Sequence, residues 1–189
     1  MKQTVCNVFT ALAWTTAMAG AHAVEYKAVA NEKSQITFHY KQMGVAMDGR
    51  FKKFSAQLNF DPTKPAAAQA QIDIDLAQID TGSSEADDEV VGKGWFNVKA
   101  FPKASFVAKR IKATGANQYE VSGTLTIKGK AQDIQFPLKY AAQGATGVFT
   151  GGFVMRRGDF SIGEGIWSKF DVVANDVQVN FQLTAVSGK

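Results

Sequence analysis

Few residues of this sequence belong to the types that carry out catalysis or hold metal ions. The two histidines are His22 and His39, and the single cysteine, Cys6, lies near the start of the chain. A nucleophile needs a neighbouring base, and a zinc site needs several His, Cys or acidic ligands close together. His39 is therefore expected to be an exposed or hydrogen-bonded side chain. The sequence also contains no G-x-S-x-G, H-E-x-x-H or phosphate-binding loop pattern.

Acidic residues are dense between positions 73 and 89, where calcium binding is the first chemistry to consider. Asp73 and Asp75 alternate along one run, and further acids follow from Asp80 to Glu89. No glycine-centred D-x-D-x-D-G pattern is present, so the spacing does not match a calcium loop. The acids are interpreted as a solvated face of the protein.

A second charged group follows a pair of arginines near the C-terminus. Arg156 and Arg157 precede Asp159 and Glu164 in a glycine-bearing segment. The favoured interpretation is ion pairing that closes one end of the fold, and contact with the polar end of a ligand is the weaker one. An enzyme acting on a lipid or quinone through Asp159, Glu164 or His39 stays as an alternative hypothesis.

Large apolar side chains are the more informative group. The chain has 14 Phe, 3 Trp and 5 Met. Rings form the walls of apolar pockets, and methionine adapts to flexible apolar ligands, although both also fill ordinary cores. We predict that they line a slot for a long apolar chain. The predicted lining residues are Phe38, Tyr40, Met43, Met47, Phe51, Trp95, Phe96, Phe106, Phe153, Met155, Phe160 and Trp167, and the predicted head-group contacts are Gln42, Arg156 and Asp159.

The elements that would position these side chains are β-strands. Apolar and polar residues alternate strictly in successive runs, which is the pattern of half-buried strands. The runs cover residues 36–40, 54–60, 72–76, 106–108, 119–127, 134–140, 148–157 and 177–185, with 26–29 as an additional candidate. Short turns marked by glycine separate several of them, which indicates antiparallel hairpins.

Two stretches fall outside this alternation. Residues 84–88 read as the acid-rich start of a short helix leading toward Trp95, and residues 159–176 read as a long loop. Eight antiparallel strands can form a sandwich or a closed barrel, and a barrel of this size holds side chains or one ligand. The prospective inner face is almost uniformly apolar, which disfavours a lumen for sugars or ions.

The first 23 residues have the features of a signal peptide. Lys2 precedes an apolar run over 5–19, and the small-x-small sequence Ala21-His22-Ala23 follows. Cleavage there would remove Cys6 and leave a domain over residues 24–189. The style of this segment indicates export to the periplasm of a Gram-negative bacterium. The net charge of +4 does not indicate binding to nucleic acid.

From residue 24 onward the chain resembles the YceI-like family of bacterial periplasmic proteins. The resemblance rests on the order and spacing of several short segments rather than on one motif. They are Ser34 to Phe38, Gly44 to Phe54, Ile79-Asp80-Thr81, Trp95 to Phe106, Gly123 to Gly129, Arg156 to Gly163 and Val177 to Ala185. Two departures are Gln42-Met43-Gly44, where many members have His before Leu-Gly, and Ser161, where many have glycine.

The resemblance implies an all-β fold: an antiparallel, eight-stranded, lipocalin-like barrel with an apolar pore that holds a polyisoprenoid, prenyl quinone, fatty amide or fatty acid. It implies a carrier without catalysis, metal or cofactor, whose partner is the lipid itself. A membrane-bound quinone or cytochrome as a further partner is inferred from family context. A ligand-free stress-protective barrel remains a second alternative, and the pairing of two barrels stays open.

Overall fold

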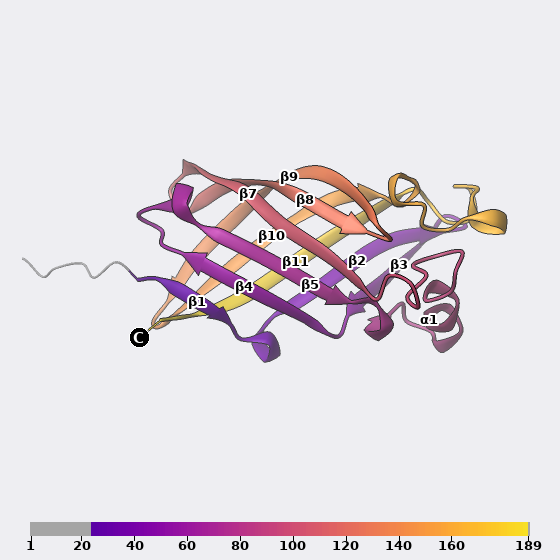
Figure 1. Cartoon of the computed structure of the whole chain (residues 1–189), viewed down its shortest axis with the longest axis horizontal. Coiled ribbons are helices and arrows are strands. Elements are labelled where there is room, and N and C mark those ends of the chain that lie inside the picture. Colours follow the sequence, from indigo (N-terminus) through magenta and orange to yellow (C-terminus); the bar gives the residue numbers. More distant parts are fainter. Residues whose placement is uncertain (1–23, 189) are drawn as a thin grey trace, which may run out of the picture.

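The computed structural model describes residues 24–188, most of which form β-strands (Figure 1). None of the helices in this range is long and apolar enough to span a bilayer. The strands are β1 Tyr26–Val29, β2 Gln35–Gln42, β3 Val45–Phe51, β4 Phe54–Phe60, β5 Gln69–Asp75, β6 Ile79–Asp80, β7 Lys103–Gly115, β8 Gln118–Ile127, β9 Lys130–Gln143, β10 Thr146–Arg156 and β11 Asp176–Ser187, and α1 is Ser84–Val90.

The sheet closes on itself because the short strand β1 has a partner on each side. It pairs antiparallel with β4 and with β11. Within residues 24–188 the closed ring contains eight strands in the order β1, β4, β5, β7, β8, β9, β10 and β11. The predicted eight-stranded antiparallel barrel is confirmed. Closure pairs the strand edges that an open sheet would leave exposed.

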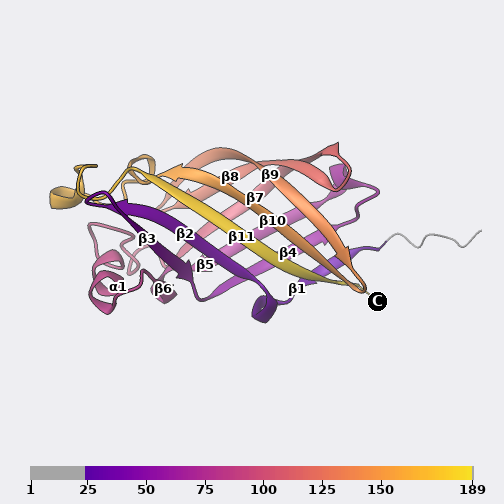
Figure 2. The ribbon, with the colours of Figure 1, turned by 180° about the vertical axis from the view of Figure 1, so that it is seen from behind.

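One end of the barrel is extended by strands outside this ring. The final strand β11 pairs with β1 near its C-terminal end and with β2 over residues 178–182. β3 then pairs with β2, and β6 adds two residues to β3. These strands, the helix α1 and the segment after β10 lie at the same end of the barrel, opposite the C-terminus (Figures 1 and 2).

Strand β3 was not among the predicted runs, because glycine interrupts its inner face. Met47 and Phe51 border the interior, and Gly49 lies between them. A Cβ atom at Gly49 would overlap the ring of Phe38 on the neighbouring strand. The glycine makes room for that ring, and the apolar alternation is lost where the two strands come closest.

The end of the barrel near the C-terminus is filled by aromatic side chains. Phe60 packs edge-on against Tyr119 and Phe149, with ring centroids 5.3 and 5.0 Å apart. The hydroxyls of Tyr26 and Tyr140 are hydrogen-bonded at 2.8 Å. All five side chains are buried. This packing leaves the α1 end of the barrel as the location of the larger interior space.

Candidate functional site

A cavity of about 510 Å³ lies in the α1 end of the barrel and is called the outer cavity below. Small-ligand pockets typically measure ~300–1,000 Å³. Its wall comes from several strands, from α1 and from the segments that follow α1 and β10. Most of the side chains on this wall are apolar, and those with carboxylate, hydroxyl or amide groups are Tyr40, Gln42, Thr81, Ser83, Glu85 and Glu89.

The structure brings most of the predicted lining residues together around this cavity. They come from β2, β3, β10 and the loops near α1, which are distant in the sequence. The predicted residues on the wall are Phe38, Tyr40, Met47, Phe51, Trp95, Phe96, Phe153, Met155 and Trp167, and the predicted head-group residue Gln42 is also there.

Three predicted lining residues lie elsewhere. Met43 is 76% exposed in the turn between β2 and β3, where its backbone has a φ of +50°. Phe160 is buried in the short 3-10 helix after β10, outside the residues that border the cavity. Phe106 points into the barrel but borders a deeper space. Strand alternation predicts whether a side chain points into the barrel or out of it. It does not predict how deep in the barrel the side chain lies, or whether the residue belongs to a turn, and these determine which side chains it contacts.

The predicted head-group contacts Arg156 and Asp159 form an ion pair outside the wall of the outer cavity. The Arg156 Nη2 and Asp159 Oδ2 atoms are 2.9 Å apart, and the arginine side chain is 63% exposed. Their expected contact with a ligand is therefore not supported by the geometry. This pair is the ion pairing favoured for the segment. Glu164 forms a second pair, because its Oε2 lies 2.7 Å from Nζ of Lys128, and this lysine lowers the pKa of Glu164.

The neighbouring Arg157 is the buried member of the pair, at 2% exposure, and borders the cavity. Its guanidinium donates hydrogen bonds to backbone carbonyls throughout the segment after β10. The accepting carbonyls belong to Ile162, Gly163, Trp167, Lys169, Val173 and Ala174. Each of its nitrogens is engaged, so Arg157 shapes the segment rather than offering donors to a ligand.

The surroundings of Arg157 explain how its charge is held without a contact to a carboxylate of the described residues. The guanidinium lies over the rings of Trp95 and Phe170, at 5.5 and 4.9 Å from their centroids. Burial lowers the pKa of Arg157, but arginine stays protonated in proteins. Gly163 makes room for it, because a Cβ atom there would overlap the guanidinium. The sequence analysis did not single out Arg157 as a residue of the cavity wall, because nothing in the residue type distinguishes it from Arg156.

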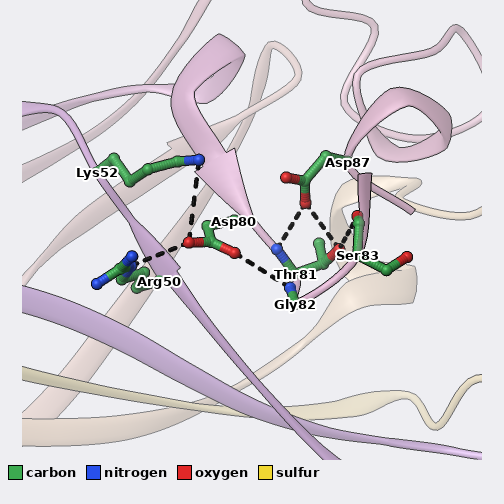
Figure 3. Close-up of polar contacts among 7 residues, drawn as sticks. All are labelled: Arg50, Lys52, Asp80, Thr81, Gly82, Ser83 and Asp87. Atoms are coloured by element: carbon green, nitrogen blue, oxygen red, sulfur yellow. Dashed lines mark hydrogen bonds and ion pairs between the residues drawn. The ribbon is translucent and has the colours of Figure 1, made fainter. Parts of the chain in front are cut away.

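Polar contacts hold α1 against the mouth of the cavity (Figure 3). The buried Thr81 donates from its backbone N and its Oγ1 to Oδ1 of Asp87, at 2.6 and 2.8 Å. Ser83 caps the helix by accepting a hydrogen bond from the Ala86 N–H. Asp80 accepts hydrogen bonds from the Gly82 N–H and from Nε of Arg50 on β3. Both contacts lower the pKa of Asp80.

The cavity wall has few polar groups free to act on a ligand. The indole Nε1 of Trp167 donates to Oε1 of Glu89 at 2.7 Å, whereas the buried Nε1 of Trp95 finds no hydrogen-bond partner among residues 24–188. Burial, followed by the charge of Asp87, raises the pKa of Tyr40. His39 lies outside the cavity lining, with Nδ1 2.5 Å from Oδ1 of the exposed Asp48.

Metal-binding geometry does not emerge from the described residues. Over 24–188 no three His, Cys, Asp or Glu side chains come together in a way that could hold an ion. The acids of strand β5 and of α1 are spread over separate contacts. The arrangement of apolar side chains around the outer cavity is suited to enclosing an apolar molecule.

Sequence reasoning also missed the aliphatic part of the wall. It is formed by Ile74, Leu76, Ile79, Ala86, Val90, Ala104, Leu125, Ile127, Ile162, Val173, Val177 and Val179. Those on β5, β8 and β11 lie on the predicted inner faces, so alternation was the signal that could have found them, whereas Ile79 on β6 lies outside the predicted runs. Their types are those of any β-sheet core, and only their depth in the barrel distinguishes them.

The departure at Ser161 has a structural counterpart. Its φ of +52° lies in the left-handed region, which glycine adopts most readily. Ser161 instead accepts hydrogen bonds from two lysines, Lys128 at its carbonyl oxygen and Lys130 at its Oγ. These contacts attach the segment after β10 to the turn between β8 and β9.

Solved structures share this architecture. The structure of BcnA from Burkholderia cenocepacia has a TM-score of 0.81 and 44% identity, covering 84% of this chain and 99% of that one. The structure described as a polyisoprenoid binding domain from Saccharophagus degradans, implicated in plant cell wall breakdown, has a TM-score of 0.66 and 20% identity. That match covers 88% of this chain and 99% of the other.

Sequence comparison agrees with the structural matches. A UPF0312 protein of Pseudomonas putida is 28% identical over 143 residues, which are 73% of this chain and 74% of the relative. The family model described as the YceI-like domain matches residues 27–185. That range contains the barrel strands, apart from the first residue of β1 and the last two of β11, and all of the residues that line the outer cavity. By sequence and by fold, this chain belongs to the YceI-like domain family.

Proposed function

We propose that this protein is a periplasmic carrier that holds one long-chain lipid in the outer cavity. The ligand class is a polyisoprenoid or a similar chain, such as a prenyl quinone, a fatty amide or a fatty acid. The observation that carries the proposal is the cavity itself: about 510 Å³ with a mostly apolar wall, inside a barrel whose other end is filled by aromatic rings.

The energetics of such a site favour a chain over a compact polar ligand. Each methylene group moved from water to an apolar surrounding contributes about 0.8 kcal/mol. A chain along this cavity would contact Phe38, Phe51 and Phe153 without needing a hydrogen bond from them. Polar groups such as Gln42 and Glu85 belong to the α1 and β2–β3 part of the wall. We therefore orient the ligand with its polar end toward α1.

The family supports binding rather than catalysis. One structural relative is described as a polyisoprenoid binding domain, and the YceI-like domain spans nearly all of the described part of this chain. The residues of the enzyme hypothesis do not converge: Asp159 and Glu164 form separate ion pairs, and His39 contacts Asp48.

The cellular setting is part of the same proposal. The signal-peptide features over 1–23 lie outside the described residues and support export to the periplasm. A carrier in the periplasm would receive its lipid from a membrane and deliver it to a membrane-bound partner. We propose that this partner is a quinone-using or cytochrome-containing protein. The ligand needs no cofactor to bind.

The test is to identify a copurifying lipid. The full chain is expressed in a Gram-negative host, purified without detergent and extracted with organic solvent for mass spectrometry. We expect an apolar long-chain compound near one equivalent per protein. Absence of such a compound, together with failure of the stripped protein to bind any added long-chain lipid, would overturn the proposal.

Two neighbouring substitutions make the test specific to the cavity. Phe153→Asp places a carboxylate on the cavity wall, whereas Val154→Asp places one on the next residue of the same strand, which is 55% exposed. We expect lipid loading to fall at least tenfold in folded F153D and to stay at the wild-type level in V154D. Equal loading of the two variants would remove this wall from the binding site.

A further inference from the structure

A second space lies deeper in the same barrel and is called the inner cavity. It measures about 50 Å³, roughly a tenth of the outer cavity, and its lining is almost wholly apolar. Among its lining residues are Phe106, Phe136 and Phe181, whereas Phe153 borders the outer cavity. The two cavities therefore meet at a group of aromatic rings.

Strand alternation places the boundary between the cavities at one depth around the barrel. Residues two apart on a strand point to the same side of the sheet. On each strand that borders both cavities, the inward residue that lines the outer cavity is followed, two or four residues away, by one that lines the inner cavity. The outer and inner pairs are Ile74 and Ile72, Ala104 and Phe106, Leu125 and Val121, Phe153 and Phe149, and Val179 and Phe181.

Four rings fill this boundary and are called the Phe layer: Phe106, Phe136, Phe153 and Phe181. Phe136 is central, because its ring centroid lies 5.4 Å from Phe106, 5.5 Å from Phe153 and 5.6 Å from Phe181. The Phe136 and Phe153 rings are stacked, with an interplanar angle of 25°. The rings come from β7, β9, β10 and β11, which together with β8 are consecutive strands of the closed ring, so the layer fills the interior beside this part of the wall.

Two glycines on the barrel wall give these rings their space. A Cβ atom at Gly123 would come 2.6 Å from Cζ of Phe106, and one at Gly151 would come 2.5 Å from Cζ of Phe181. Both glycines lie on inward-facing positions between an outer and an inner lining residue. Any other side chain there would overlap a ring, and at Gly123 it would also overlap the backbone carbonyl of Val107, so both positions leave the rings their space by being glycine.

We propose that the Phe layer sets how far a ligand chain reaches into the barrel, and so determines the chain length that this protein prefers. The inference rests on the proposed lipid-carrier function and deepens it. A chain entering beside α1 fills the outer cavity and stops at Phe153 and Phe136. The inner cavity is too small to hold more than about one water-sized group, whose share of liquid volume is ~30 Å³.

The consequence is that the affinity should increase with the length of the ligand chain only up to a certain length, which is called the break below. Each methylene group that enters the outer cavity should improve affinity by about fourfold. Groups beyond the layer remain in water or must displace the rings, so the gain should stop. Removing a ring should join the two cavities and move the break to longer chains. Enlarging a wall residue of the outer cavity should move it to shorter ones.

The experiment measures the affinity of lipid-stripped protein for straight-chain alcohols and prenyl alcohols of increasing length, by displacement of a fluorescent fatty acid. The lengthening variants are Phe153→Ala and the milder Phe153→Leu, and the shortening variant is Ala104→Leu. Phe160→Ala is the matched control, because Phe160 is a buried phenylalanine outside the linings of both cavities. Each variant is first shown to be folded by circular dichroism and cooperative unfolding.

We expect the break to move to longer chains in F153A, to move less far in F153L, to move to shorter chains in A104L and to stay in F160A. A break that is unchanged in folded F153A and A104L, while the wild-type protein binds chains, overturns the Phe layer as the determinant and leaves the carrier function standing. Failure of the wild-type protein to bind chains of any length overturns both.

Discussion

Arg156 and Arg157 are neighbours of the same type, yet the fold uses them in opposite ways. Arg156 is exposed and pairs with Asp159 at the surface. Arg157 is buried and donates to carbonyls over residues 162–174. Strand β10 ends at Arg156, so the chain direction changes between the two residues. One turn of the backbone therefore decides which guanidinium organises the cavity wall.

This difference predicts unequal effects of the same substitution at the two positions. Arg157→Met keeps much of the apolar stem but leaves several buried carbonyls without donors, which should lower the free energy of unfolding by at least about 3 kcal/mol. Arg156→Met removes only an exposed ion pair and should change it by less than about 1 kcal/mol. Urea unfolding of both variants measures the contrast, and equal losses would contradict the assigned role of Arg157.

At the scale of elements, α1 and the residues around it form the cover of the outer cavity. The helix has only seven residues, too few to be stable alone in water. Its position depends on the hydrogen bonds of Thr81 to Asp87, the Ser83 cap and the ion pair of Asp80 with Arg50. A short element held by a few contacts is also the part of the site most able to open for a ligand.

Removing one of these contacts should loosen the cover without unfolding the barrel. Asp87→Ala removes the carboxylate that accepts from the N–H and the hydroxyl of buried Thr81, which leaves the hydroxyl only the longer contact to the Ser83 carbonyl, and should lower the free energy of unfolding by about 1–3 kcal/mol. Amide exchange of residues 81–90 should increase more than exchange in β8 and β9. Asp88→Ala is the control, because Asp88 is exposed on the same helix. Exchange that rises equally in both variants, or uniformly over the chain, would count against this anchoring.

How far the elements could be predicted depended on how regular their inner faces are. β8 was predicted closely, because four large apolar residues, Tyr119, Val121, Leu125 and Ile127, flank the single inward glycine on its inner face. β3 was missed because Gly49 takes an inward position that the Phe38 ring occupies. The two-residue β6 exists through its pairing with β3 and has no pattern of its own. The alternation of apolar and polar residues therefore predicts a strand when most of its inward positions carry large apolar side chains. It does not predict a strand that is defined by its pairing with a neighbour.

At the scale of the whole molecule, titrating groups should define a range of pH in which the barrel is stable. Hydrogen bonds lower the pKa of Asp80, Asp133 and Glu164 in the folded state, from Gly82, Lys109 and Lys128 respectively. Burial raises the pKa of Tyr40 and Tyr140.

The directions of these pKa shifts predict that the free energy of unfolding is highest at intermediate pH and falls in both acid and alkali. A lowered carboxyl pKa contributes stability above the unfolded value near ~4, and it is lost as the pH falls through the folded value. A raised tyrosine pKa contributes stability below ~10, and it is lost as the pH rises through the folded value. Urea unfolding at a series of pH values should show stability falling at both ends. A midpoint that rises below pH ~4 would contradict the predicted fall in acid.

The sequence by itself determined the class of the fold and the character of its interior. Strict alternation places apolar side chains on one face of each strand, and eight such strands enclose them whatever their order in space. The same alternation put Phe38, Phe51 and Phe153 on inner faces. These features are local, because each depends only on residues a few positions apart.

Only the tertiary structure decided which inward side chains border open space and which fill it. Phe153 and Phe136 both point into the barrel, but one faces the outer cavity and the other the inner one. Met43 and Phe160 have suitable types and lie outside both linings. A cavity is the volume that remains after all the strands and loops have packed together. No single segment of the sequence carries that information, because the remaining volume belongs to the assembled barrel.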